Sequence, residues 1–387
     1  MRSFLAGVSL VLVSVALSAG LAELALRLTH YGDENPMHLV AFMDFDPLLG
    51  WWHKRNYMGV MAKDEFRATL QYDANGIRGL DPLYNKPQGA RRVVVIGDSF
   101  VDGYTVATPE RMTEVLASRL GKRFEVVNLG VGAYSTDQEL LLLERQGWKY
   151  QPDLVLLAFY YNDVFFNGEK SLGPAQKPLF AMDNGNLRLT NVPVPYPVQH
   201  FRDRFKLLQL IQTILRYNPA VHKAAIRVGL LHDELPEDFP HPGWAGGSWE
   251  DFAVYQKTET PEYAKAWAIT QALLQKMKKE TEQHGAQFLV FYIPARIEAY
   301  PEEWRSDHLP ADYDPDIVRE RLSQLCKTEG ISYIDPSDRF LEAARSSQLY
   351  YLHDLHWNAA GHRLAGEILA GHLQNSASLL GIGSGSN

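Results

Sequence analysis

The stretch RRVVVIGDSFVDG, residues 91–103, decides the fold of this chain. The segment Arg92–Ile96 is typical of a strand covered on both faces, and it stops abruptly at Gly97-Asp98-Ser99. Glycine supplies backbone freedom and Asp98 or Ser99 can cap a helix, so one interpretation is a plain strand-to-helix turn. The other is a serine nucleophile at the carboxyl end of a strand, where open α/β sheets place their chemistry.

Length and composition are those of a globular protein. The chain has 387 residues, of which 46% are hydrophobic and 22% charged, enough for two or three units with large cores. A net charge of -8 creates no general field that attracts nucleic acid, so nucleic-acid partners are excluded. The single cysteine, Cys326, excludes an internal disulfide, and its setting RLSQLCKTEG predicts a buried position on a helix.

The amino-terminal segment is predicted to meet a membrane. Residues 4–22, FLAGVSLVLVSVALSAGLA, carry no charge, and as a helix they would span roughly 28 Å, close to the hydrocarbon thickness of a bilayer. Residues 1–30 are therefore predicted as a membrane anchor or a signal peptide. A small-residue site at Ala16-Leu17-Ser18 favours cleavage, whereas a helical pattern that continues past it, with Glu23 and Arg27 able to pair, favours an anchor.

Both alternatives export the rest of the chain. The predicted location is therefore a membrane-anchored protein whose main domain lies on the periplasmic or extracellular side, with a cleaved secreted form as the alternative.

A rhythm of strands and helices begins after residue 88. Strands are predicted at Arg92–Ile96, Phe124–Leu129, Leu154–Tyr161, Gln287–Ile293 and Ile331–Ile334. Helices are predicted at Pro109–Leu120, Thr136–Trp148, Pro261–His284, Pro315–Glu329 and Ala359–Gln374. Alternating strands and helices imply an α/β fold with a parallel, doubly wound sheet, and five strands favour the flavodoxin-like order.

One region precedes this pattern of strands and helices, one interrupts it, and a short tail follows it. Residues 31–88 are rich in aromatic and turn-forming residues and predict a small irregular or antiparallel subdomain. The main domain is predicted over residues 89–377, with a large insertion at 164–258. The tail 378–387 is predicted to be disordered.

The insertion contains two recognisable elements. A hairpin is predicted around Asn184-Gly185-Asn186. The apolar helix pattern Phe205–Tyr217 is interpreted as a core helix rather than a membrane contact. The favoured role of the insertion is to cover a site at the edge of the sheet.

Four segments bring chemistry to that edge, and three of them directly follow a predicted strand. VVVIGDSF contains Ser99, VVNLGVGAYSTDQ contains Gly132 and Ala133, LVLLAFYYND contains Asn162, and HDLHWNAAGH contains Asp354 and His356. Because parallel strands all end at the same edge, these residues are expected to converge there.

These residue types suit acyl transfer. A serine hydroxyl becomes a good nucleophile when an imidazole takes its proton, so Ser99 is the candidate nucleophile and His356 the candidate base. Asp354 would orient the imidazole and stabilise its charged form. The predicted oxyanion donors are the backbone N–H of Ser99, a backbone N–H at Gly132 or Ala133, and the side-chain amide of Asn162.

The sequence resembles the SGNH/GDSL hydrolases, a superfamily of serine esterases and acyltransferases. The four blocks of that family are a G-D-S turn, a glycine after the second strand, G-x-N-D after the third, and an acid–histidine pair near the carboxyl terminus. The match covers residues 90–375 in the family's order. The resemblance implies a bacterial envelope enzyme with an amino-terminal anchor and no metal or organic cofactor.

Three departures from the family pattern affect the prediction. Counting from Asn128 puts Ala133 where the second block often has glycine. Tyr160 replaces the usual glycine of the third block, which predicts a narrower pocket. Asp354 lies two residues before His356 in the form D-x-H-W instead of the common D-x-x-H. The D-x-H-W form resembles alginate and cell-wall polysaccharide O-acetyltransferases and their esterase relatives.

The predicted function is therefore an exported, membrane-tethered serine esterase that hydrolyses acyl or acetyl esters, with an acetylated glycan as a candidate substrate. One alternative is an O-acetyltransferase acting on an envelope polysaccharide. Another is a non-catalytic binding or assembly factor on the same fold.

A metal cluster is the remaining alternative for the last block. His353, Asp354, His356 and His362 are residue types that bind zinc. No motif such as H-E-x-x-H accompanies them, and His362 lies six residues after His356 in a predicted helix, which disfavours a metal site.

Overall fold

The computed structural model describes most of the chain. The described residues are 2–29, 42–63, 65–79, 84–172, 175–196, 205–217, 221, 224, 227–228, 253–304, 312–352 and 354–376. Contacts divide the chain into a smaller unit, residues 1–41 with 196–239, and a larger unit, residues 42–195 with 240–387. The predicted division at residues 1–30, 31–88 and 89–377 remains a prediction, and the predicted tail lies outside the described residues.

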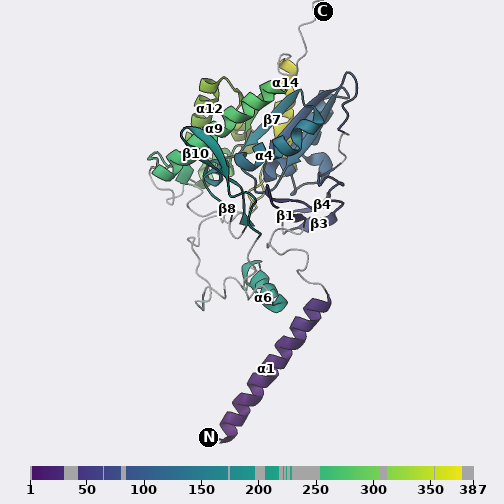
Figure 1. The fold of residues 1–387 in the computed structure, drawn as a ribbon, viewed down its shortest axis with the longest axis vertical. Helices are drawn as coiled ribbons and strands as arrows, with labels where there is room; N and C mark the ends of the chain where they lie inside the picture. The colour runs from purple at the N-terminus through teal and green to yellow at the C-terminus, as the bar shows by residue number, and fades with distance from the viewer. Residues whose placement is uncertain are drawn as a thin grey trace, which may run out of the picture. The chain divides into compact units, whose positions relative to one another are not determined.

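A five-stranded parallel sheet forms the centre of the larger unit (Figure 1). Its strands are β5 (Arg91–Gly97), β6 (Phe124–Gly130), β7 (Leu154–Phe159), β12 (Gln287–Tyr292) and β13 (Ser332–Ile334). Their order is β13-β12-β7-β5-β6, with every neighbouring pair parallel. The five predicted strands are present and the predicted flavodoxin-like order is confirmed.

Helices cover both faces of the sheet, so the doubly wound prediction is also confirmed. The long helices are α3 (Met112–Leu120), α4 (Thr136–Arg145), α9 (Pro261–Gln283), α12 (Ile317–Glu329), α13 (Ser337–Ala344) and α14 (Ala359–Asn375). Alternate residues of β5 and β7, such as Val93 and Leu156, join α3, α13 and α14 in one buried apolar cluster. On the opposite face, α4 contacts β5 and α9, and α9 contacts β12.

Two predicted helices were too long. The helix predicted from Pro109 divides at Arg111, whose extended ψ of 148° separates the 3-10 turn η1 (Thr108–Glu110) from α3. The helix predicted to end at Trp148 ends at Arg145, and the 3-10 turn η2 (Gly147–Tyr150) follows it. Apolar periodicity continues across both breaks, which is why sequence patterns alone do not locate them.

Several short helices were not predicted. Besides α13, which was also not predicted, they are α2 (Ser99–Asp102), α5 (Asn162–Asn167), α10 (Arg296–Ala299), α11 (Pro301–Trp304) and the 3-10 turn η4 (Ala253–Tyr255). Elements of one turn or slightly more have too few residues to show a helical period. Two of them, α2 and α5, directly follow strands at the edge where chemistry was predicted.

The segment after residue 42 is antiparallel, as expected. Strand β1 (Met43–Asp46) pairs with β2 (Gly50–His53), and β3 (Met58–Ala62) pairs with β4 (Arg67–Gln71). Buried side chains join this segment to loops of the main sheet: Arg78 donates to the carbonyls of Asp102, Gly103 and Val106, and Trp51 Nε1 donates to the carbonyl of Gly132 at 3.0 Å. The segment therefore braces the loops that follow β5 and β6.

The hairpin predicted in the insertion is confirmed. Strand β10 (Leu179–Asp183) pairs with β11 (Asn186–Thr190) across a two-residue turn in which Asn184 and Gly185 have φ of 49° and 80°. Positive φ at both positions is what an Asn-Gly turn provides. Just before the hairpin, buried Lys177 forms an ion pair of 2.5 Å with buried Asp137 on α4. The insertion is thus fastened to the main domain, while its predicted role as cover remains a prediction.

The smaller unit contains α1 (Arg2–Leu28) and α6 (Lys206–Tyr217). Within α1, Ser9–Leu28 has a mean hydropathy of 2.0 and is long enough to cross a membrane, although a signal sequence passes the same test. The predicted pair is present: Arg27 Nε donates to Glu23 Oε1 at 2.8 Å. The other Glu23 oxygen accepts the backbone N–H of Leu207 at 2.8 Å.

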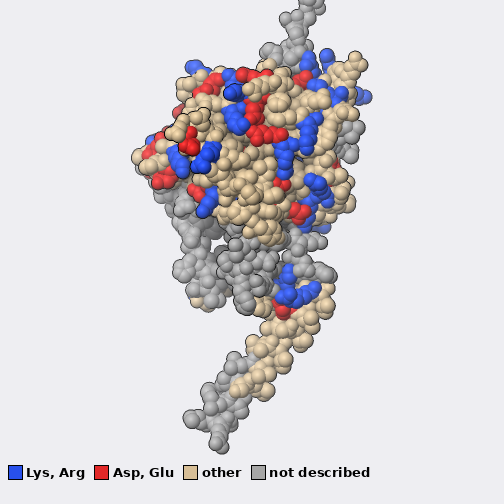
Figure 2. Space-filling model, in the orientation of Figure 1, with Lys and Arg blue, Asp and Glu red and all other residues tan. Residues whose placement is uncertain are grey.

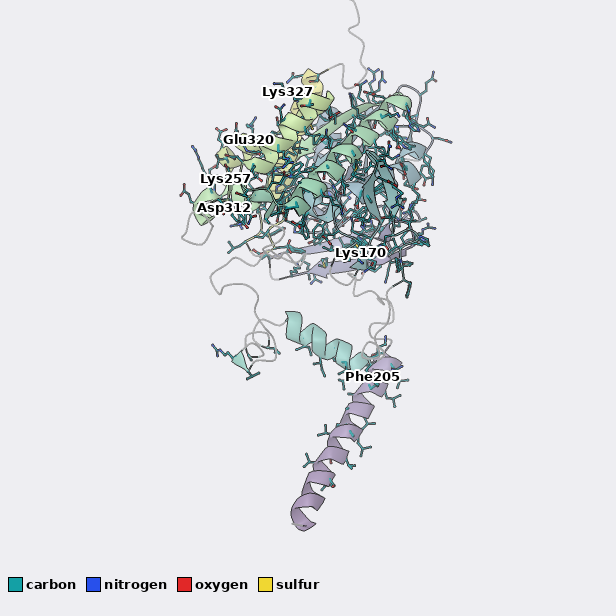
Figure 3. All side chains as sticks on the ribbon, turned by 60° about the vertical axis from the view of Figure 1, so that its left-hand side comes forward. Lys170, Phe205, Lys257, Asp312, Glu320 and Lys327 are labelled. Carbon is teal, nitrogen blue, oxygen red and sulfur yellow. The ribbon has the colours of Figure 1, made fainter. Side chains whose placement is uncertain are left out.

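The interpretation of Phe205–Tyr217 as a core helix is wrong. Figure 3 marks Phe205 where α6 begins, and α6 contacts α1 within the smaller unit. Leu208, Ile211 and Ile214 are about two-fifths exposed, at 41%, 41% and 42%. An amphipathic pattern predicts that a helix has an apolar face but not what covers that face.

Charges on the larger unit are mixed. On the face shown in Figure 2, Lys and Arg side chains lie among Asp and Glu side chains. On this face neither sign of charge forms a large field of its own.

Buried His362 on α14 makes the stability of the fold depend on pH. Its Nδ1 accepts the N–H of Met112 at 3.4 Å, and its ring meets Trp357 edge-on. Burial, and then the nearby Arg78 and Arg111 with His356, lower the pKa of His362 from 6.5 to about 3. The unfolded chain therefore takes up this proton first, and stability is lost as the pH falls from the unfolded value towards the folded one.

We expect His362→Gln to weaken this pH dependence, because glutamine can accept the Met112 N–H without titrating. Between pH ~7 and pH ~5, the free energy of unfolding should fall by about 2 kcal/mol less in the variant than in wild type. Denaturant titration of the full chain in mild detergent at both pH values measures this. His372→Gln, at an exposed position of the same helix, serves as the control, and equal pH slopes in all three proteins would contradict the prediction.

Candidate active site

The Gly97-Asp98-Ser99 turn places Ser99 at the start of α2. Asp98 Oδ1 accepts the N–H of Phe100 at 2.9 Å, so Asp98 is the helix cap, and Gly103 ends the helix in the left-handed region. Gly130 makes this packing possible, since a Cβ there would lie 2.2 Å from the Asp102 nitrogen. The short helix therefore sits directly against the end of β6, with Ser99 at the carboxyl edge of the sheet.

Three of the predicted residues form a continuous hydrogen-bonded chain. Ser99 Oγ lies 2.7 Å from His356 Nε2, and His356 Nδ1 lies 2.6 Å from Asp354 Oδ1. An ionised carboxylate can only accept, which puts the imidazole proton on Nδ1 and leaves Nε2 to accept from the serine hydroxyl. The side chains of His356 and Asp354 are 13% and 2% exposed, so this chain is largely shielded from water.

The D-x-H spacing works because of the backbone conformation at Leu355. Leu355 has a φ of 66°, in the left-handed region that leucine rarely adopts. Next to it, the N–H of Tyr351 donates to the carbonyl of His356 at 2.9 Å, and Tyr350 pairs with Trp357 as an isolated bridge. This tight loop turns Asp354 and His356 toward each other although only one residue separates them.

Aromatic side chains hold the imidazole in place. The His356 ring lies 4.9 Å from the Phe100 ring and 5.3 Å from the Tyr104 ring, measured between centroids. Behind them, fully buried Trp357 packs on Phe100 and on Phe340 of α13. The ring is thus packed between α2 and the loop before α14, which restricts its rotation.

Sequence reasoning missed two residues that hold Asp354. Lys63, in the connection between β3 and β4, forms an ion pair with Asp354 Oδ2. Glu65 accepts the backbone N–H of Leu352 at 2.6 Å and that of Asp354 at 2.9 Å. In the sequence AKDEF these residues are typical of a solvated charged turn, and no motif distinguishes them.

The ionisation of Asp354 follows from these contacts. Burial by itself raises the pKa of Asp354, but the charge and hydrogen bond of His356, followed by those of Lys63, outweigh it and lower the pKa to about 2. Asp98 shows the opposite balance, since burial is the dominant cause and raises its pKa to about 6. Asp354, the acid in the hydrogen-bonded chain with His356 and Ser99, is therefore ionised across the neutral pH range.

The other predicted residues follow neighbouring strands. Gly97 at the end of β5 pairs with Gly130 of β6 on one side and Ala158 of β7 on the other. The loops after these three strands therefore begin at the same level of the sheet. Gly132 and Ala133 come shortly after β6, and Asn162 comes shortly after β7, so all lie at the edge that carries Ser99.

Ala133 has a glycine-like conformation. Its φ is 65°, which explains why the family often has glycine at this position. The carbonyl of Gly132 accepts from Trp51 Nε1. Because the carbonyl and N–H of a trans peptide point in opposite directions, the Ala133 N–H is directed away from Trp51.

Asn162 begins α5 but does not cap it. Tyr161 is the N-cap residue and makes no side-chain cap hydrogen bond. The Oδ1 atom of Asn162 is buried and has no hydrogen-bond partner among the described residues. Its neighbour Asp163 is fully buried and accepts the Tyr160 N–H at 3.3 Å, a structural role.

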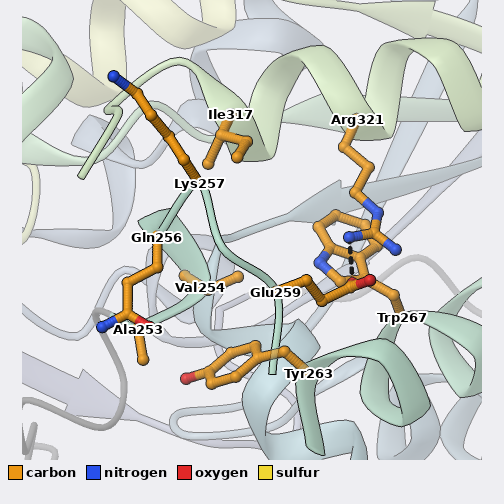
Figure 4. Close-up of a pocket in the computed structure, with 9 residues that line it drawn as sticks. All are labelled: Ala253, Val254, Gln256, Lys257, Glu259, Tyr263, Trp267, Ile317 and Arg321. Carbon is orange, nitrogen blue, oxygen red and sulfur yellow. Dashed lines mark hydrogen bonds and ion pairs between the residues drawn. The ribbon is translucent and has the colours of Figure 1, made fainter. Parts of the chain in front are cut away.

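A small cavity lies away from this hydrogen-bonded chain. Figure 4 shows it between η4 and the beginnings of α9 and α12, where the Arg321 guanidinium lies 4.6 Å from the Trp267 ring centroid and pairs with Glu259. Its volume of about 50 Å³ is far below the roughly 300 Å³ at which ligand sites begin.

Metal ligands do not cluster in the described part of the chain. No group of three or more His, Cys, Asp and Glu side chains there could hold a metal ion. Of the four residues weighed for such a site, His353 lies outside the described residues.

A family model supplies the identification. The model of the GDSL-like lipase/acylhydrolase family matches residues 95–364. The chain belongs to this family, which places it among ester-hydrolysing enzymes. No curated protein sequence matches the chain significantly.

Three solved structures show what the chain is similar to in fold. An alpha/beta hydrolase enzyme from the metagenome of Lake Arreo, Spain, is 13% identical, with 77% of this chain and 99% of that chain covered and a TM-score of 0.38. A catalytic mutant of an acetylxylan esterase from Geobacillus stearothermophilus is 14% identical, with 77% and 97% covered and a TM-score of 0.38. A G-D-S-L lipolytic family member from Veillonella parvula is 13% identical, with 75% and 99% covered and a TM-score of 0.37.

The left-handed backbone at Leu355 leads to a prediction about ester turnover. We expect Leu355→Val to lower kcat/KM for p-nitrophenyl acetate about tenfold or more, because a β-branched residue resists this φ and would displace the imidazole. Leu355→Asn should stay near wild type, since asparagine tolerates the conformation. Equal kinetics for the two variants would show that the loop does not depend on the residue at this position.

Proposed function

We propose that this protein is an exported, membrane-tethered serine esterase in which Ser99, His356 and Asp354 act as a catalytic triad. The observation that carries the proposal is the hydrogen-bonded chain from Ser99 Oγ to His356 Nε2 at 2.7 Å and from His356 Nδ1 to Asp354 Oδ1 at 2.6 Å. Family membership independently supports ester hydrolysis.

The proposed reaction has two halves. In the first, Ser99 Oγ attacks the ester carbonyl while its proton passes to His356 Nε2, and the imidazolium then returns that proton to the departing alcohol. In the second, water attacks the acyl-serine, His356 takes a proton from the water, and Ser99 recovers it as the acid is released. Asp354 stays ionised throughout and stabilises the imidazolium, in keeping with its low pKa of about 2.

The proposed oxyanion donors are the Ser99 N–H, the Ala133 or Gly132 N–H, and the Asn162 amide. The N–H of Ser99 stands at the first position of a helix, where no partner exists within the helix. The direction of the Ala133 N–H, opposite to the carbonyl held by Trp51, favours Ala133 over Gly132. The helix α5 has Tyr161 and not Asn162 as its N-cap residue, so the Asn162 side chain is not used in capping, which favours a role of its amide NH2 group toward a ligand.

The proposed location and substrate rest on the sequence. The apolar stretch of α1 supports a tether or an export signal. The D-x-H-W segment, which resembles polysaccharide O-acetyltransferases and their esterase relatives, supports an acetyl ester of an envelope glycan as the substrate. Transfer of the acetyl group to a glycan hydroxyl would use the same residues and replace water in the second half-reaction. Incubation with an acetyl donor and glycan, scored as acetylated glycan against free acetate, separates the two.

We expect Ser99→Ala to abolish turnover of a p-nitrophenyl ester, because no other group replaces the nucleophile. A fluorophosphonate probe should label wild type at Ser99 and leave the variant unlabelled. Ser118→Ala, at an exposed position of α3, is the matched control and should behave as wild type. Unchanged turnover in Ser99→Ala would sink the mechanism, and an unlabelled wild type would favour a non-catalytic binding factor.

We expect Asn162→Ala to lower kcat by about 10²- to 10³-fold, the usual effect of removing one oxyanion donor. KM should change little, because the interaction is made mainly in the transition state. Steady-state kinetics with the same ester measures this, with Asn186→Ala in the exposed hairpin strand β11 as the control. A variant that keeps kcat but raises KM would instead assign Asn162 to ground-state binding.

A further inference from the structure

We infer that Lys63 is a positioning residue of the proposed triad: its ammonium group holds the outer oxygen of Asp354, orients that carboxylate toward His356, and sets the pH range in which the enzyme is active. The inference rests on the proposed function. It concerns a residue that lies 291 positions from Asp354 in the sequence and outside the part of the chain matched by the family model.

The geometry gives each carboxylate oxygen of Asp354 its own partner. Oδ1 faces His356 Nδ1 at 2.6 Å, and Oδ2 is paired with Lys63 Nζ. Rotation of the carboxylate would disturb both contacts, so the ion pair on one side fixes the hydrogen bond on the other. The side chains of Asp354 and Lys63 are 2% and 29% exposed, so the pair is shielded more than a surface ion pair.

The same connection also holds the backbone of the acid. Glu65 accepts the N–H groups of Leu352 and Asp354, while Phe66 packs at 5.3 Å from the Tyr351 ring and 6.1 Å from the Tyr104 ring. The antiparallel segment therefore touches both the loop that carries the triad acid and the turn that follows the nucleophile. Lys63 contacts the carboxylate itself.

The charge of Lys63 has an effect separate from its position. A cation beside Asp354 offsets part of the negative field that stabilises the imidazolium form of His356. Among the described residues, the other titratable groups around the pair are Glu65, Asp98, Tyr104, Tyr351 and His362. These groups are present in every variant below, so a comparison of variants isolates Lys63.

Two consequences follow from removing the cation. The carboxylate loses an anchor, which lowers the rate of the chemical step. The full negative charge of Asp354 then acts without compensation on the proposed Asp354–His356 pair, so we expect the acid limb of the kcat/KM profile to move to higher pH. A purely structural role for Lys63 would lower the rate or the thermal stability without moving that limb.

The test compares Lys63→Met, Lys63→Gln and Lys63→Arg, each made in the full chain and kept in mild detergent. For each variant we would measure kcat, KM and the pH profile with p-nitrophenyl acetate, and the melting temperature. We expect Lys63→Met and Lys63→Gln to lose about tenfold or more in kcat with KM little changed, and to shift the acid limb up by about half a pH unit or more. Lys63→Arg, which keeps the charge, should restore the wild-type limb and most of the rate.

Arg67→Met is the matched control, because it removes an exposed cation from the adjoining strand β4. Wild-type kinetics in both neutral variants would overturn the inference, and so would a loss of rate or stability with an unmoved acid limb. If the Lys63→Met variant fails to fold, the Lys63→Gln variant provides the same comparison. Turnover by wild type that is lost in Ser99→Ala upholds the proposed function even if Lys63 proves dispensable, whereas an inactive wild type overturns both.

Discussion

The buried hydrogen bond between Asp354 and His356 is the constraint on which the rest of the site depends. A carboxylate with a side chain only 2% exposed is costly to keep charged unless its oxygens are paired. Each of its oxygens has a partner, His356 on one side and Lys63 on the other. The left-handed conformation of Leu355 and the backbone contacts of Glu65 also position this carboxylate, because they hold the loop that carries it.

The antiparallel segment at residues 42–79 is part of the site as well as part of the fold. Trp51 binds the turn after β6, Arg78 binds the carbonyls that follow α2, and Lys63 binds the carboxylate of Asp354. Parallel strands bring their carboxyl ends to one edge, but the loops beyond those ends need partners for their backbone groups. In this protein the buried side chains of Trp51 and Arg78 supply such partners.

Most of the sheet was predictable from local pattern. Five apolar runs separated by helical periods define the parallel order, because strands covered on both faces are almost continuously apolar. Helix boundaries were less predictable where periodicity runs past a break, as at Arg111. The environment of α6 was not predictable at all, since its apolar stripe is equally compatible with a core, and what lies against a helix face is decided by segments distant in the chain.

The sequence by itself determined which residues are the candidates for the chemistry: a G-D-S turn with Ser99, an N-D pair with Asn162, and the D-x-H segment that holds Asp354 and His356. Ser99 and Asn162 stand in short blocks after strands, and Asp354 and His356 stand just before a helix, so local spacing is enough to propose them. Only the tertiary structure decided how the acid is held. Lys63 and Glu65 come from a charged turn nearly three hundred residues away, and ion pairs and backbone contacts over that separation leave no periodicity or motif, because they depend on where two loops meet in space.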